Sequence, residues 1–167
     1  ENSDWGELSY LINIETITFQ EPYSILNEYQ YYFAYRPPYV LEFNYNNQDF
    51  VLINVHYKCC GDGNLDEQDS QDEEYRRLQA SIYLDNYIST NFGNSNVIIA
   101  GDFNDSLDDS ASDNVFNIFL DSSEYLFADL SMALEENYWE YWSFPNWPSH
   151  LDHILITSEL FDEYEKS

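Results

Sequence analysis

The chain has 167 residues, with 32 acidic side chains against 5 basic ones and a formal net charge of −27. Its length suits one domain with a hydrophobic core, and 16 Tyr, 11 Phe and 4 Trp exclude a disordered chain despite the charge. No apolar run approaches the roughly 20 residues that cross a bilayer, so we expect no membrane span. The charge repels long polyanions unless a divalent cation, a local basic group or high salt compensates.

Hydrophobic patterning predicts strands that alternate with helices. Strands are expected at residues 8–18, 39–43, 50–56, 97–100 and 151–157, where apolar residues run together or alternate. A helix is expected at residues 71–90, because Ser70 and Glu73 form a capping box and Gly93 lies just past its end. A second helix is expected near residues 115–120, with Ser112 or Asp113 as its cap. This order predicts a single α/β or α+β layered domain over residues 1–167.

The two cysteines are adjacent, at Cys59 and Cys60. They do not match a zinc pattern, which needs more ligands at other spacings. They either form a strained vicinal disulfide or remain reduced as small hydrophobes, and we predict the disulfide. The low lysine count and the acidic composition predict a secreted, extracellular protein, and they also fit adaptation to a salty medium.

Polar residues stand at the ends of three predicted strands. Asn54, His56 and Lys58 share one face of the first strand. Asp102 and Asn104, two apart after a buried strand, would reach one point. In the last strand, Asp152 enters a hydrophobic run, flanked by His150 and His153. Each signal is weak alone, but three in order predict a functional site at one end of a sheet.

These motifs together resemble a known superfamily. The order is Arg36-Pro37-Pro38, then Asn54-Val55-His56-Tyr57-Lys58, then Gly101-Asp102-Phe103-Asn104, then His150-Leu151-Asp152-His153-Ile154-Leu155. It resembles the endonuclease/exonuclease/phosphatase superfamily over most of residues 8–160. The resemblance implies the deoxyribonuclease-I-like fold, a four-layered α/β sandwich with two packed sheets. It also implies hydrolysis of phosphodiesters or phosphomonoesters with Mg²⁺, Mn²⁺ or Ca²⁺.

The resemblance assigns a role to five residues. Asp102 would activate or orient the attacking water, and Asn104 would hold that water or a phosphate oxygen. His56 would contact the scissile phosphate, with Asp152 orienting it and favouring its charged form. Arg36 would bind phosphate through its fork of donors. Asp102 and Asn104 are also the expected contacts of a Mg²⁺ or Mn²⁺ ion.

Two family motifs are not found, and their absence shapes the functional prediction. These are an early metal-binding Glu and a final Ser-Asp-His. We therefore expect a partial domain, incomplete at both ends and inactive alone, from a metal-dependent extracellular nuclease or phosphodiesterase. The alternative is a non-catalytic extracellular module on the same fold, structural or self-associating and stabilised by calcium. The substrate stays open among DNA, RNA, a lipid head group and a small phosphate ester.

The acidic loop at residues 62–73 has the ligand spacing of an EF-hand. Asp62, Asn64, Asp66 and Glu73 stand at loop positions 1, 3, 5 and 12, and a helix follows. The loop lacks the glycine expected at position 6, where Glu67 stands. Two interpretations follow, an acidic solvated loop that ends in a helix cap, or a loop ordered by Ca²⁺ beside the active site.

Overall fold

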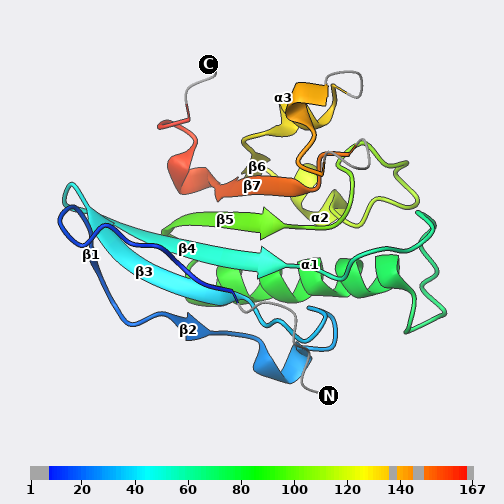
Figure 1. Cartoon of the computed structure of the whole chain (residues 1–167), viewed down its shortest axis with the longest axis horizontal. Helices are drawn as coiled ribbons and strands as arrows, with labels where there is room; N and C mark the ends of the chain where they lie inside the picture. The colour runs from blue at the N-terminus through cyan, green and yellow to red at the C-terminus, as the bar shows by residue number, and fades with distance from the viewer. Residues whose placement is uncertain (1–7, 136–138, 145–148, 165–167) are drawn as a thin grey trace.

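The described strands all join one mixed sheet. A computed structural model describes residues 8–135, 139–144 and 149–164. The strand order is β1-β3-β4-β5-β7-β6, and β2 also pairs with β3 (Figure 1). The strands are β1 (Thr18–Phe19), β2 (Tyr23–Ser24), β3 (Tyr39–Tyr45), β4 (Gln48–His56), β5 (Asn96–Asp102), β6 (Tyr125–Phe127) and β7 (Asp152–Thr157). The helices are α1 (Glu73–Asn91), α2 (Asn117–Leu120) and α3 (Leu130–Ala133), with 3-10 turns at Asn27–Tyr29, Trp139–Tyr141 and Ser158–Leu160.

The central strands combine a hairpin with a parallel crossover. β3 and β4 form an antiparallel hairpin, and Asn46 and Asn47 between them both adopt positive φ, as a tight two-residue turn requires. β4 then pairs in parallel with β5, and α1 makes the connection. β7 lies antiparallel to β5 on its other side. The carboxyl ends of β4 and β5 therefore meet the amino end of β7.

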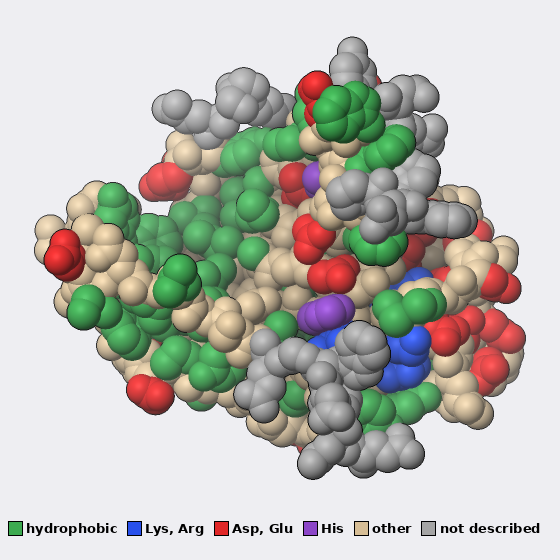
Figure 2. All heavy atoms as spheres, viewed as in Figure 1, with side chains coloured by type: hydrophobic (Ala, Val, Ile, Leu, Met, Phe, Trp, Pro, Cys, Tyr) green, Lys and Arg blue, Asp and Glu red, His purple; other side chains and the backbone are tan. Residues whose placement is uncertain are grey.

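The core lies between the sheet and α1. Alternate residues of the central strands, such as Val55, Ile99 and Leu155, are fully or almost fully buried in one cluster with Leu84 and Ile88 of α1. The opposite face of the sheet is less covered, and Ile154 there is 46 % exposed. Hydrophobic side chains spread over this open face in Figure 2, beside acidic groups and a histidine. The predicted layered α/β class is confirmed, and the described residues supply one sheet with helices against it.

Three of the predicted elements take a different form in the structure. Residues 8–17 form no strand, because a turn closes on the carbonyl of Asn13 and leaves Leu11 and Ile14 exposed. The long helix begins at Glu73 rather than residue 71, since the Asp72 side chain, not Ser70, accepts the backbone N–H of Tyr75. The second helix is a single turn at Asn117–Leu120 without a side-chain cap. No described helix is both long enough and apolar enough to cross a membrane.

Candidate active site

Three predicted site residues lie in one row across the sheet. His56 is the register partner of Asp102, and Asp102 is the register partner of Asp152. All three belong to the strand positions that face away from α1, because their neighbours in sequence are buried against it. Nε2 of His56 is 3.4 Å from Oδ2 of Asp102. The pairing thus brings a histidine and two carboxylates from three strands together at one end of the open face.

Glycine is required immediately before Asp102. Gly101 has φ +149°, and a Cβ there would lie 2.0 Å from the carbonyl oxygen of Val55 in β4. β4 and β5 therefore approach each other in a way that any side chain would prevent. Beyond the strand, Asn104 adopts φ +56°, and its N–H donates to Oδ1 of Asp102 at 2.9 Å. This local turn orients the Asp102 carboxylate.

The carbonyl oxygen of Tyr57 connects the remaining two predicted residues. It accepts from Nη2 of Arg36 at 3.1 Å and from Nδ2 of Asn104 at 3.2 Å. Nε of Arg36 is buried and has no hydrogen-bond partner among the described residues. A buried N–H without an acceptor is costly, and this donor lacks the partner that a buried polar group normally has. Sequence reasoning missed Tyr57, because a backbone carbonyl leaves no signal in residue type.

Burial and neighbouring charges set the protonation of the site. Burial and the negative charge of Asp152 raise the pKa of Asp102, while hydrogen bonds from Asn104 and the charge of Arg36 oppose the rise. Burial and the positive charge of Arg36 lower the pKa of His56, while Asp152 acts the other way and is outweighed. Asp152 thus favours the charged form of His56, but burial and Arg36 outweigh it and favour the neutral imidazole. The ring faces Asp102.

The donor set fits a hard divalent cation that keeps several water ligands. Asp102 and Asp152 are adjacent carboxylates whose repulsion a cation would relieve, and the Asn104 side chain lies beside them. Among the described residues, His56, Asp102 and Asp152 do not bring three ligand atoms within 4.8 Å of one another. Mg²⁺ commonly binds through one or two carboxylates, with water and substrate phosphate completing its shell. Asp102 and Asp152 are the residues here that would hold it.

A second polar cluster lies where the turn after β6 meets the start of β7, with His153 on the α1 side of the sheet. Oδ2 of Asp129 is 2.6 Å from Nδ1 of the buried His153 and 2.9 Å from Nε2 of His150. Burial alone would raise the pKa of Asp129, but the hydrogen bond and charge of His153 outweigh burial and lower it. Both histidines are thus held by contacts within the fold. The partner Asp129 was missed, although an acidic residue just after a short strand is a recognisable signal.

The predicted calcium loop is held by its own backbone. Oδ1 of Asp62 accepts the N–H of Asn64, and Oδ1 of Asp66 accepts the N–H of Gln68. Glu73 pairs instead with Lys58, at 3.4 Å. Within the described ranges, the side-chain oxygens of Asp62, Asp66 and Glu73 do not gather within 4.8 Å. The loop is thus tied together by its own hydrogen bonds and ends in the Asp72 helix cap, and Ca²⁺ binding by it stays a prediction.

The predicted disulfide is not formed. Cys59 and Cys60 are free and exposed, with their Sγ atoms 2.9 Å apart, a distance longer than an S–S bond. The Cys60 thiol donates to Sγ of Cys59, and Cys60 adopts φ +73°. Adjacent cysteines can bond only in a strained ring, and here the backbone places them side by side without one.

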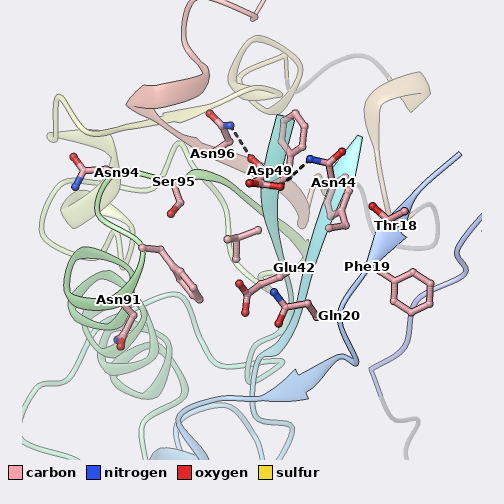
Figure 3. Close-up of a pocket in the computed structure, with 14 residues that line it drawn as sticks. Thr18, Phe19, Gln20, Glu42, Asn44, Asp49, Asn91, Asn94, Ser95 and Asn96 are labelled. Atoms are coloured by element: carbon pink, nitrogen blue, oxygen red, sulfur yellow. Dashed lines mark hydrogen bonds between the residues drawn. The ribbon is translucent and has the colours of Figure 1, made fainter. Parts of the chain in front are cut away.

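A hollow of about 790 Å³ lies at the far end of the sheet from the polar row. It is bordered where β4 and β5 begin, near Asp49 and Asn96, whereas His56 and Asp102 stand where those strands end. Figure 3 shows Asn44 and Asn96 donating hydrogen bonds to Asp49 in this hollow. Among the described residues, no histidine or basic side chain lines it. The hollow therefore offers carboxylates but no cationic group for a phosphate, and the polar row remains the candidate active site.

The fold and the row of acidic and imidazole groups define a layered α/β domain with a candidate hydrolytic site. Residues 13–165 match the sequence model of the Endonuclease/Exonuclease/phosphatase family. The chain therefore belongs to this family. A search of curated proteins found no match.

Solved structures share the fold at low sequence identity. A humanized D. rerio TDP2 with 14 mutations is 15% identical, with a TM-score of 0.60, covering 86% of this chain and 53% of that one. D. rerio TDP2 complexed with a single-strand DNA product is 14% identical, with a TM-score of 0.58, covering 86% and 54%. An endonuclease/exonuclease/phosphatase from Bacteroides vulgatus is 12% identical, with a TM-score of 0.53, covering 87% and 56%. This chain thus spans about half the length of these structures.

Proposed function

We propose that this chain carries part of the active site of a metal-dependent phosphoester hydrolase that cleaves phosphodiesters. The observation that carries the proposal is the row of His56, Asp102 and Asp152 across three strands, with Arg36 beside it. A purely structural module would gain nothing from placing two carboxylates next to each other on an open face. Family membership supports phosphoester chemistry in general.

Each residue has a role in binding or proton handling. Arg36 binds a phosphate oxygen through its guanidinium group, and the Asn104 carboxamide binds a second oxygen or the attacking water. Asp102 orients that water, and the neutral His56 beside it donates a hydrogen bond to the phosphate or takes up a proton. A bound Mg²⁺ or Mn²⁺ would neutralise phosphate charge, which the net charge of −27 makes necessary.

The substrate class is proposed as a nucleic acid or a small phosphodiester. One relative in fold, D. rerio TDP2, is complexed with a single-strand DNA product. The negative charge of this chain disfavours long polyanions at low salt, so the reaction on DNA or RNA should accelerate when salt or divalent cation is added. Location outside the cell stays a prediction from composition.

Hydrolysis of bis(p-nitrophenyl) phosphate and of single-stranded DNA and RNA oligonucleotides in Mg²⁺ or Mn²⁺ tests the proposal. The assay should use the protein as it occurs in nature, and the 167 residues alone, which span about half the length of the similar structures, should turn over little or no substrate. Asp102→Asn and His56→Ala should each lower the rate by about 100-fold or more. Asp49→Asn, which removes a charge at the opposite end of β4, should leave it unchanged. Equal rates in all four proteins would contradict the proposed site.

A further inference from the structure

The two histidines beside Asp129 face more hydrogen-bond acceptors than their neutral rings have N–H groups to donate. Nδ1 of His153 faces the Asp129 carboxylate at 2.6 Å, and its Nε2 faces the backbone carbonyl of Asp105 at 3.1 Å. Nε2 of His150 faces the same carboxylate oxygen at 2.9 Å, and its Nδ1 contacts the carbonyl of Tyr141. Carbonyl and ionised carboxylate oxygens only accept, so these four contacts call for four N–H groups. Two neutral imidazoles supply two.

Protonation of one ring would supply three N–H groups and leave one of the four contacts without a proton. Protonation of both rings is unfavourable in these surroundings. The His153 side chain is inaccessible to solvent, and its ring packs against Phe103, Phe116 and Phe127 at 5.6–6.2 Å between centroids. Two imidazolium ions against one carboxylate would leave a net positive charge in these apolar surroundings, which is costly.

A metal cation between the rings and Asp129 removes the need for two of these N–H groups. Each histidine then donates its one N–H to a backbone carbonyl, and the other ring nitrogen is free to ligate. This is the usual arrangement of metal-bound histidines, in which the outer hydrogen bond fixes the tautomer and the ring orientation. The potential ligand atoms of Asp129, His150 and His153 all lie within 4.8 Å of one another. The other oxygen of Asp129 accepts the N–H of Ile154 at 2.8 Å, which holds the carboxylate in place.

We propose that Asp129, His150 and His153 form a zinc site. Two imidazole nitrogens and one carboxylate oxygen suit Zn²⁺ better than Mg²⁺ or Ca²⁺, which prefer oxygen ligands. His150 borders a hollow of about 330 Å³ that Asp108 and Glu135 also line, so water can reach the ion and complete a tetrahedral shell. Residue parity in β7 puts His153 on the α1 side and Asp152 on the open side. His153 therefore enters this site from the side of the sheet opposite the Asp152 carboxylate.

The ion would join two segments far apart in the sequence. Asp129 follows β6 and begins α3, while His150 and His153 flank the start of β7. A shared ligand shell would stabilise the folded state by mass action, because the unfolded chain does not hold these side chains together. The expected role is structural, and the proposal does not depend on the proposed hydrolase activity.

Binding of Zn²⁺ to the chelator-treated 167-residue chain tests the site. All proteins should carry Cys59→Ser and Cys60→Ser, and Mg²⁺ should be present in excess, so that neither thiols nor surface carboxylates take up zinc. One equivalent should bind in competition with a chromophoric chelator and should raise the thermal unfolding midpoint. Co²⁺ in its place should show the visible bands of a tetrahedral site.

Two histidine variants distinguish zinc binding at this site from zinc binding elsewhere on the chain. His150→Ala, at a side chain that is 14% exposed, should weaken zinc binding by about 100-fold or more and abolish the rise in the midpoint. His56→Ala, the matched control on the open face, should bind like the parent. Circular dichroism of metal-free His150→Ala should show the parent fold. Zinc binding unchanged by His150→Ala, lost in His56→Ala, or absent from the parent would each overturn the proposal, and none of these outcomes depends on hydrolysis.

Discussion

At the residue scale, backbone conformation restricts which residues can stand beside the candidate active site. Gly101 and Asn104 flank the Asp102 motif, and both have positive φ. Gly101 in addition has no room for a side chain, because the carbonyl of Val55 lies where Cβ would be. The position of the Asp102 carboxylate therefore depends on glycine at residue 101, because any side chain there would push β4 and β5 apart.

Gly101→Ala should destabilise the protein by at least about 2 kcal/mol, since both the steric clash and the unfavourable φ add to the cost. Gly63→Ala is the matched control, because Gly63 also has positive φ but a Cβ there meets nothing within 4 Å. Gly63→Ala should lower the free energy of unfolding by only about 1 kcal/mol. Urea unfolding monitored by tryptophan fluorescence measures the loss in each variant. Similar losses in the two variants would show that the close approach of β4 and β5 is not rigid.

Asp109 is the residue with the clearest pH response. Burial and a hydrogen bond with Asp105 raise its pKa to about 7. The folded chain therefore retains a proton that the unfolded chain releases near pH 4, so this carboxyl lowers stability as the pH rises from about 4 to about 7. Asp109→Asn mimics the protonated form and should gain stability relative to wild type at about pH 8 but not at about pH 5.

Denaturant midpoints at the two pH values measure this difference. Asp108→Asn, at an exposed neighbour, is the control for removal of one negative charge. If both variants gain equally at high pH, the gain reflects the net charge of the chain rather than the Asp105–Asp109 contact.

At the element scale, the start of α1 shows how a local signal can be misplaced by two residues. The sequence offers several carboxylates and hydroxyls before the helix, and Ser70 with Glu73 matches a capping box. The structure uses Asp72, whose Oδ1 accepts from the N–H of Tyr75 at 2.7 Å. Buried Arg77, one turn into the helix, also fixes the position of α1 through Asp105 and through two carbonyls of the preceding loop.

Asp72→Ala should therefore destabilise the protein by about 1 kcal/mol, the usual cost of removing an N-cap. Ser70→Ala should change stability by less than about 0.5 kcal/mol, as expected for a side chain outside the cap. Thermal or urea unfolding of the two variants compares the caps directly. A larger loss of stability in Ser70→Ala than in Asp72→Ala would instead support the predicted capping box of Ser70 and Glu73.

At the scale of the whole molecule, a charge of −27 on 167 residues opposes compaction. Two of the basic side chains are engaged in contacts of their own and do not neutralise the other surface carboxylates. Arg76 binds the carbonyl of Tyr31, and Arg77 pairs with Glu74 and Asp105. Most of the repulsion among surface carboxylates is therefore left to the solvent ions to screen. The same charge makes a bound cation favourable at either of the two candidate sites.

The unfolding midpoint should rise when NaCl is increased from about 0.01 M to about 1 M, because the Debye length falls from about 30 Å to about 3 Å. The effect should become small near pH 4.1, the isoelectric point, where little net charge remains to be screened. A midpoint that does not depend on salt at neutral pH would mean that the carboxylates are already neutralised by local partners.

The sequence by itself determined the layered α/β class, the central strands, the long helix and the residue types of the candidate active site. These follow from periodicity and from polar residues at strand ends, which are local properties. Tertiary structure decided which side chains and backbone groups from different segments contact one another. Strand register placed His56 beside Asp102, the Tyr57 carbonyl joined Arg36 to Asn104, and the turn after β6 brought Asp129 to two histidines. Register, backbone carbonyls and contacts between distant segments depend on the whole packed chain, so no single stretch of sequence specifies them.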